Sequence, residues 1–298
     1  MKILNLGSLN FDKVYNLPHF ILEGETLLSQ GYGEFFGGKG LNQSLALARA
    51  GAEVYHAGAI GPDGGPLREC LEASGVRTRY LRQVETVSGH AIIQKVNGLN
   101  CIIVCGGANR CVTPEYIREV LADFGEGDLL LLQNEVSGGS FAMEEARRRG
   151  MKVAFNASPI TDEILSYPLE LVDYFLVNEV EGRALAGVDS EDFGVILDGL
   201  AARFPQAAVV LTVGSQGVLY RDAGLRAQHP CYRVPVADTT AAGDTFCGYF
   251  LAGVASGLSV PDCLRQASMA AAIAVSRDGA AASIPTRDEV AAFGEAHA

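Results

Sequence analysis

The sequence lacks the residue spacings that most metal, redox and hydrolase sites require. Its seven cysteines form no CxxC pair and stand mostly inside apolar runs, which predicts small buried side chains rather than a disulfide or zinc framework. They are Cys70, Cys101, Cys105, Cys111, Cys231, Cys247 and Cys263. The five histidines show no HExxH or i, i+4 spacing, and no G-x-S-x-G motif is present. These absences argue against a histidine-based metal site and a Ser-His-Asp hydrolase.

Positive charge is scarce, and no long apolar run opens the chain. Lys and Arg number 23 against 35 Asp and Glu, a formal net charge of −12, which argues against broad binding to nucleic acid or to an anionic membrane. The first apolar run stops at Gly7 and Ser8, too early for a signal segment or a transmembrane span. We therefore expect a cytoplasmic protein.

Apolar segments and helical patterns alternate through the 298 residues, 48% of which are hydrophobic. Near-continuous apolar runs predict strands buried on both faces; they cover 2–7, 54–61, 128–134, 152–158, 174–178 and 207–214. Helices are predicted at 41–50, 64–74, 114–123, 140–149, 179–186, 190–203, 241–256 and 261–276. This order predicts an α/β fold, a doubly wound and mostly parallel sheet with helices on both faces.

Two stretches interrupt the alternation, at about 14–36 and 88–105. The second contains "VNGLN", which is typical of a hairpin turn. Strands inserted into an α/β frame predict a small β-sheet lid over the carboxyl edge of the main sheet, where ligands bind in such folds. Because no linker or repeat separates the segments, we expect a single domain over 1–298.

The segment "FFGGKGLNQSLALARAGA" (35–52) joins a glycine-rich turn to an apolar helix pattern. From Gly33 it matches the phosphate-loop pattern except at the last position, where Gly40 replaces the hydroxyl that binds magnesium. An alternative interpretation, a turn capped by glycine before a core helix, explains the glycines but does not explain Lys39 and Asn42. Those two side chains offer hydrogen-bond donors suited to hydroxyl groups, and glycine permits close approach of a ligand.

A second glycine-containing segment, "DTTAAGDTFCGYFLAG" (238–253), begins a long small-residue helix. Its first turn, formed by Ala241, Ala242 and Gly243, leaves backbone N–H groups free for an anion. Asp244 would repel that anion, yet a base that activates a nucleophile beside a transferring phosphoryl group belongs there. The alternative is a carboxylate that only complements the helix dipole.

Two further motifs follow predicted strands. "NEVE" sets Asn178 and Glu181 one helical turn apart, where their oxygens suit a hydrated magnesium ion or form a capping box. "LTVGSQGV" (211–218) fits a loop beneath nucleotide phosphates or an ordinary hairpin turn.

In this order the motifs resemble those of the ribokinase-like (PfkB) family of sugar and nucleoside kinases, over essentially the whole chain. "GGKGLNQSLALARAGA" is similar to the N-terminal signature of the family and "DTTAAGDTFCGYFLAG" to its C-terminal one. The segments "GSLNFD", "LLLQNE", "NASP" and "AVSRDGAAASIP" resemble the ribokinase branch.

The resemblance implies residue roles. The sugar hydroxyls would be bound by Asn10, Asp12, Gly38, Lys39, Asn42 and Glu135. Asp244 would act as general base on the primary hydroxyl, while the N–H groups of Ala241, Ala242 and Gly243 stabilise the developing charge. ATP would be bound by Asn178, Thr212, Gly214, Ser215, Gly217, Gly243 and Ser268.

Metal ions are implied in the same way. Asn178 and Glu181 would position Mg²⁺ through water. A monovalent cation, K⁺, would bind at Asp238, Thr240, Ala274, Arg277, Gly279 and Ser283 and order the loop 238–244. Two residues depart from the family pattern: Ala241 replaces a common glycine, and Ser268 replaces a larger polar side chain.

The resemblance therefore implies an ATP-dependent phosphotransferase with an alcohol acceptor, ribose, and a homodimer formed through the lid. Within the same class, the acceptor could instead be deoxyribose, a nucleoside such as pseudouridine, or another small sugar. A non-catalytic sugar-binding protein is the alternative from another class.

Overall fold

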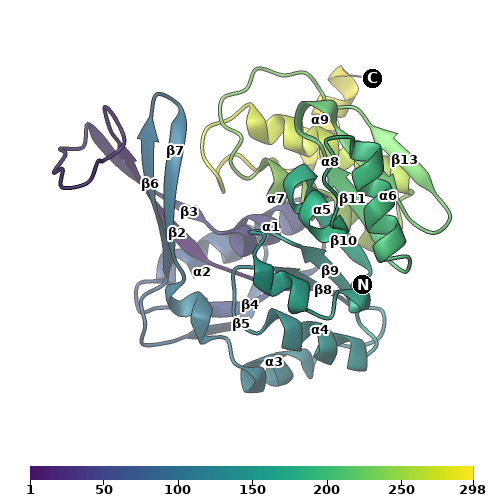
Figure 1. Ribbon diagram of the computed structural model, residues 1–298. Coiled ribbons are helices and arrows are strands. Elements are labelled where there is room, and N and C mark those ends of the chain that lie inside the picture. Colours follow the sequence, from purple (N-terminus) through teal and green to yellow (C-terminus); the bar gives the residue numbers. More distant parts are fainter. Residues whose placement is uncertain (298) are drawn as a thin grey trace.

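The computed structural model describes residues 1–297 and contains a large, mostly parallel sheet (Figure 1). Its strand order is β13-β12-β11-β10-β9-β8-β1-β4-β5. Among the described residues, β12 pairs antiparallel with both β11 and β13, and the other neighbours pair in parallel. The strands are β1 Ile3–Leu6, β4 Val54–Ile60, β5 Arg77–Gln83, β8 Leu129–Gln133, β9 Lys152–Asn156, β10 Tyr174–Asn178, β11 Ala208–Thr212, β12 Val218–Arg221 and β13 Arg226–His229. The predicted doubly wound α/β fold is confirmed.

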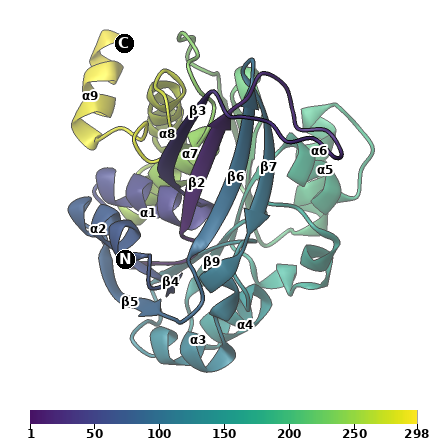
Figure 2. The ribbon, with the colours of Figure 1, turned by 90° about the vertical axis from the view of Figure 1, so that its left-hand side faces the viewer.

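Helices cover both faces of this sheet because neighbouring strand residues point to opposite sides. Ile3 packs with one set of helices and Leu4 with the other. The first set is α1 Lys39–Arg49, α2 Gly65–Ala73, α7 Ala242–Ala255, α8 Val260–Val275 and α9 Arg287–Ala296. The second is α3 Pro114–Leu121, α4 Gly139–Arg148, α5 Glu179–Ala186 and α6 Phe193–Arg203 (Figure 2). The buried sheet thus holds the loops at its carboxyl edge on a rigid frame.

A second sheet has four strands in the order β3-β2-β6-β7. They are β2 Asn10–Asn16, β3 Gly31–Gly37, β6 Gly89–Val96 and β7 Leu99–Cys105. The turn between β6 and β7 is Asn97-Gly98, both with positive φ (49° and 82°), as the predicted hairpin requires. This small sheet stands beside the carboxyl edge of the main sheet (Figures 1 and 2). It begins at Asn10, a few residues before the expected start at about residue 14, so Asn10 and Asp12 lie in its first strand.

The predicted strands and helices all occur, with ends displaced by a few residues. The sequence reading missed β5, β12, β13 and α9. Strand β5, "RTRYLRQ", carries charge because it lies at the edge of the sheet and buries only Thr78 and Leu81. The short 3-10 turns were also missed: η1 Gly107–Cys111, η2 Asp162–Ser166, η3 Leu169–Leu171 and η4 Gly214–Gln216.

The cysteines are free, as expected, but the prediction that they are buried is wrong for several of them. Cys247 and Cys263 are buried, whereas Cys101, Cys105 and Cys231 are exposed. Two of the exposed ones belong to β7, an apolar strand with one unpaired edge. No helix within residues 1–297 is long and apolar enough to cross a membrane.

Candidate active site

The glycine-rich turn before α1 packs tightly against the end of β1. Gly38 caps the helix with φ 92°, a conformation that favours glycine. A side chain at Gly40 would collide with the backbone of Gly7 and Ser8. Glu135, just after β8, accepts hydrogen bonds from the Ser8 hydroxyl and from the Lys39 backbone N–H (2.9 Å). The glycines therefore bring the start of α1 to the carboxyl edge of the sheet.

Three carboxylates from separate segments, Asp244, Glu135 and Glu181, act electrostatically on Lys39. Burial raises the pKa of Glu135, while the Ser8 hydroxyl and Lys39 oppose the rise. Burial, together with Glu135 and Asp244, raises the pKa of Asp12 to about 7. Burial alone would lower the pKa of Lys39, but Asp244 and Glu135 raise it above its usual value. Lys39 thus remains a cation that offsets part of the negative charge.

Asn10 is held by a residue that the sequence reading missed. The Asn109 side chain donates to Asn10 Oδ1 (2.7 Å) and accepts from the Leu9 backbone N–H (3.0 Å). Asn109 is only 1% exposed. A side chain at Gly89 would strike both asparagines. No motif marks Asn109, because it follows the small sheet in sequence and reaches Asn10 only in the fold.

Asp244 lies in the first turn of α7 and contacts α1. Its Oδ2 accepts from Asn42 Nδ2 (3.0 Å) and its Oδ1 from Gln43 Nε2 (2.9 Å). The helix starts at Ala242, one residue later than predicted, because Ala241 is left-handed with φ 61°. No side chain of the described residues caps this helix. The expectation of a free N–H is wrong for Ala242, which donates to the Thr239 carbonyl (3.3 Å). The positive dipole end and the N–H of Gly243 still suit an anion.

A cavity of about 760 Å³ opens beside this helix start. All seven residues expected to bind a nucleotide line it: Asn178, Thr212, Gly214, Ser215, Gly217, Gly243 and Ser268. Much of the remaining wall is apolar, including Val236, Phe246 and Val275. Gly217 has φ 99°, and a side chain there would collide with the His229 carbonyl. The "LTVGSQGV" segment is therefore both a turn between antiparallel strands and a wall of the cavity.

Asn178 and Glu181 form a complete capping box, one of the two roles that the sequence predicts for "NEVE". Asn178 Oδ1 accepts from the N–H groups of Val180 and Glu181 (2.9 Å each). Glu181 Oε2 accepts from the Asn178 backbone N–H (3.0 Å). Within residues 1–297 no cluster of His, Cys, Asp or Glu side chains is arranged as a direct metal site. These oxygens fit contact with a metal ion through water, since the capping bonds already occupy them.

The segments expected to hold a monovalent cation lie against each other. Asp238 Oδ1 accepts from the Thr240 N–H (2.9 Å) and hydroxyl (2.6 Å), and its Oδ2 faces the Gly279 N–H (3.4 Å). Ala237 N donates to the Val275 carbonyl (2.8 Å). Carboxylate, hydroxyl and carbonyl oxygens suit a hard cation.

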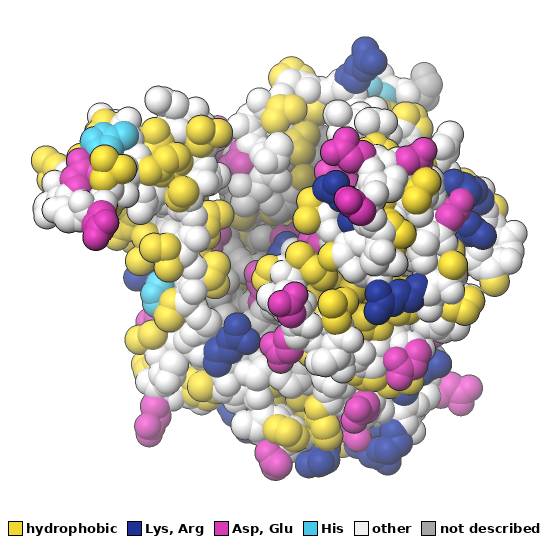
Figure 3. Space-filling view, viewed as in Figure 1, with side chains coloured by type: hydrophobic (Ala, Val, Ile, Leu, Met, Phe, Trp, Pro, Cys, Tyr) yellow, Lys and Arg dark blue, Asp and Glu magenta, His cyan; other side chains and the backbone are white. Residues whose placement is uncertain are grey.

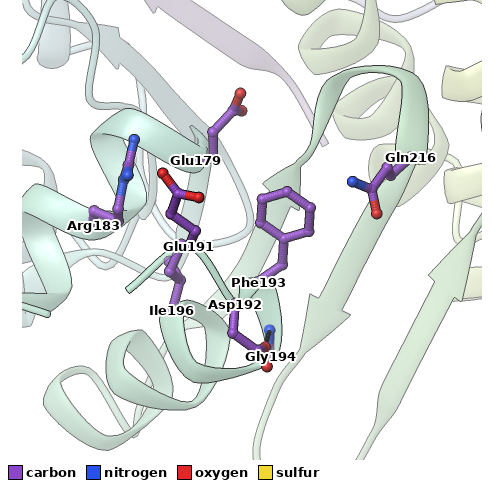
Figure 4. A pocket seen from close by; sticks show the side chains of 8 residues that line it. All are labelled: Glu179, Arg183, Glu191, Asp192, Phe193, Gly194, Ile196 and Gln216. Atoms are coloured by element: carbon purple, nitrogen blue, oxygen red, sulfur yellow. Dashed lines mark hydrogen bonds between the residues drawn. The ribbon is translucent and has the colours of Figure 1, made fainter. Parts of the chain in front are cut away.

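The surface is hollowed between the small sheet and the body, with acidic and basic side chains visible inside the hollow (Figure 3). A separate cavity of about 590 Å³ lies between the N-terminal ends of α5 and α6 and the turn that joins β11 to β12 (Figure 4). Glu179, Arg183, Glu191 and Phe193 are among its lining residues. None of the predicted site residues lines this second cavity.

Known proteins share this architecture. The model of the pfkB family carbohydrate kinases matches residues 2–287. A ribokinase of Haemophilus influenzae is 35% identical over 299 residues, covering 97% of this chain and 96% of its own. A Salmonella typhi deoxyribokinase is 29% identical over 299 residues, covering 97% of each chain. A structure of Arabidopsis thaliana ribokinase complexed with ribose and ATP is similar with a TM-score of 0.85 and 30% identity, covering 98% of this chain and 97% of that one.

Proposed function

The chain belongs to the pfkB family of carbohydrate kinases, and from this premise we propose that it transfers the γ-phosphoryl group of ATP to the primary hydroxyl of ribose, giving ribose 5-phosphate. One observation carries the proposal. Gly243 lines the nucleotide-sized cavity, while the next residue, Asp244, contacts Asn42 on the side of the carboxyl groups. The acceptor and nucleotide sites therefore meet at two consecutive residues.

In the proposed reaction, Asp244 takes the proton from the primary hydroxyl as the hydroxyl oxygen attacks the γ-phosphorus. The bond from the γ-phosphorus to the bridging oxygen breaks, and ADP leaves. The N–H group of Gly243 and the positive end of the α7 dipole stabilise the charge that develops on the phosphoryl oxygens. Lys39 lies near Asp244 and adds positive charge on the acceptor side.

Unused hydrogen-bond acceptors favour a sugar with several hydroxyl groups. Asn42 Oδ1 is buried without a partner among the described residues. Asp12, too, receives no hydrogen bond within the part of the chain that the structure describes, and its carboxyl group sits over Gly37, where a side chain would collide with it. Each hydroxyl that binds would satisfy such a group. A deoxy sugar would leave one of them buried and unpaired, which costs binding free energy and makes the site discriminate against that sugar.

Metal ions form part of the proposal. Mg²⁺ on the nucleotide would neutralise phosphate charge, with Asn178 and Glu181 orienting its waters. K⁺ would bind between Asp238, Thr240 and the segment 274–283, whose contact is described above. Asp238→Asn should weaken the response to potassium, because the carboxylate that orders the loop loses its charge.

We also propose a homodimer formed through the small sheet acting as a lid. Strand β7 lies at the edge of that sheet, and its apolar side chains are widely exposed: Leu99 66%, Ile103 61% and Val104 62%. An exposed apolar edge strand invites pairing. The single-domain reading of 1–298 and the cytoplasmic location remain predictions.

The test is ADP release with Mg²⁺-ATP against ribose, 2-deoxyribose, fructose, adenosine, uridine and pseudouridine, in potassium and in sodium. Turnover that depends on ribose and is enhanced by potassium is the expected result. A preference for deoxyribose or for a nucleoside would mean that ribose is not the acceptor. Deoxyribose is the acceptor that the name of the Salmonella typhi relative indicates for that protein. No turnover with any acceptor would favour a non-catalytic sugar-binding protein.

Asp244→Asn tests the role of the base. The amide cannot accept the hydroxyl proton, so turnover should fall by about a thousandfold or more. Binding of ribose, measured by calorimetry, should persist because the other acceptor groups remain. Turnover within about tenfold of the unmodified enzyme would remove Asp244 from this role.

A further inference from the structure

A chain of buried side-chain amides runs from Asp244 into the main sheet. Gln43 Nε2 donates to Asp244 Oδ1 (2.9 Å) and to Asn156 Oδ1 (3.1 Å). Gln43 Oε1 accepts from Gln133 Nε2 (2.7 Å). Gln43 is 0% exposed and Gln133 1%, so water does not compete for these bonds. Gln43 thus uses both of its N–H groups and its oxygen inside the protein.

The same chain continues beyond Gln133. Gln133 Nε2 also donates to Asn5 Oδ1 (3.0 Å), and Asn5 Nδ2 donates to the Ser44 hydroxyl (2.8 Å). Ser44 in turn contacts His56 Nδ1 (2.8 Å). Burial lowers the pKa of His56 to about 4, so the ring is neutral at pH 7 and can accept the Ser44 proton.

These bonds fix the orientation of each amide. Rotating the Gln43 amide by half a turn would set its oxygen against Asp244 Oδ1 and Asn156 Oδ1, and its N–H groups against those of Gln133. The orientation of Gln133 is fixed in the same way by Asn5. The network therefore presents only N–H groups to Asp244.

The two oxygens of Asp244 have different neighbours. Oδ2 accepts from Asn42, whose buried Oδ1 has no partner within the described chain and is placed to meet the acceptor sugar. Oδ1 accepts from Gln43, which belongs to neither the acceptor residues nor the nucleotide cavity. An arriving hydroxyl thus displaces or shares the Asn42 contact on Oδ2, while Oδ1 stays anchored.

We propose that Gln43 is a positioning residue for the proposed general base, holding Asp244 Oδ1 so that Oδ2 faces the attacking hydroxyl. The inference rests on the proposed function, because it assigns Gln43 to that reaction. Without the anchor, the carboxylate gains rotational freedom about its side-chain bonds, and productive alignment becomes rarer.

Gln43→Leu tests this, since leucine has a side chain of similar size but is apolar, so that it removes every hydrogen bond of Gln43. We expect kcat to fall about a hundredfold while KM for ribose and for ATP changes by less than about threefold. A merely structural role would lower the folded fraction and leave kcat per folded enzyme unchanged. The folded fraction is measured by circular dichroism and thermal unfolding of the same samples.

Tyr116→Phe is the matched control. Tyr116 is 4% exposed, and its hydroxyl bonds with the backbone of Gly58 (2.8 and 3.0 Å). Neither residue belongs to the proposed site, so this variant should lose stability and retain kcat. If Gln43→Leu does not fold, Gln133→Leu replaces it, because that change frees Gln43 Oε1 without touching Asp244. We expect it to lower kcat about tenfold.

The outcomes separate the two proposals. Unmodified enzyme without ribose turnover contradicts the proposed function. Active unmodified enzyme whose Gln43 variant retains kcat, or loses only affinity for ribose, contradicts the positioning role and leaves the proposed function intact. If neither Gln43→Leu nor Gln133→Leu changes kcat per folded molecule, the positioning role is likewise contradicted and the proposed function is unaffected.

Discussion

Asp12 is a carboxyl group that titrates near neutrality. Burial and the nearby Glu135 and Asp244 raise its pKa to about 7, so it is protonated below that pH and charged above it. Only the carboxylate has its full capacity to accept hydrogen bonds from sugar hydroxyls. Its charged fraction rises from about one tenth at pH 6 to about nine tenths at pH 8, so kcat/KM for ribose should rise about tenfold.

The check is a pH profile of kcat/KM beside that of Asp12→Asn. The asparagine variant should be less efficient at pH 8 and should lose this rise, because its side chain does not titrate. A profile shared by both proteins would assign the titration to another group, such as Glu135, whose pKa is also raised by burial.

The residues of the site were predictable where they stand in motifs. Lys39, Asn42 and Asp244 occur in long signatures, and the structure brings them together. Asn109 and the network behind Gln43 were not predictable. The bond between Gln43 and Asp244 spans 201 positions, and no local pattern encodes such a contact, since a buried glutamine in a helix resembles an ordinary polar residue.

Among the elements, the start of α7 carries backbone strain. Ala241 has φ 61°, which costs a residue with a Cβ about 1 kcal/mol or more. Ala241→Gly should relieve the strain and raise the free energy of unfolding by about 0.5–1 kcal/mol after the extra entropy of the unfolded chain is subtracted.

Denaturant unfolding of both proteins measures this change. Ala122→Gly is the matched control, because Ala122 has φ −59° at the end of α3 and glycine there should only destabilise. Equal or lower stability of Ala241→Gly would mean that the surrounding contacts compensate for the left-handed alanine.

Elements buried on both faces could be predicted from sequence, because their apolar runs are continuous. Strand β8, "LLLLQ", is an example. Strand β13, "RAQH", was not recognisable: it alternates intermediate and exposed residues at the sheet edge and is paired on one side only. Helix α9 was missed although Thr286 and Glu289 form a capping box, since only Val290 in it is buried.

For the whole molecule, the exposed edge of β7 predicts the assembly state. We expect a dimer in sedimentation at micromolar concentration. Ile103→Lys should shift it to the monomer, because burying an ammonium group at an apolar interface is costly. Leu225→Lys is the control: Leu225 is 39% exposed in the turn between β12 and β13, so the dimer should persist. A monomeric unmodified protein would contradict the prediction.

The packing of α1 on α7 has a consequence for protein synthesis. Gly248 on α7 approaches Ala46 on α1 so closely that a side chain there would collide, and Asn42 meets Asp244 across 202 positions. While a ribosome is still translating, α1 has emerged but its partner has not. Nascent or truncated chains that end before α7 leave apolar surface uncovered for chaperones and proteases, and they lack the proposed base. Activity can therefore arise only after α7 has been synthesised and packed against α1.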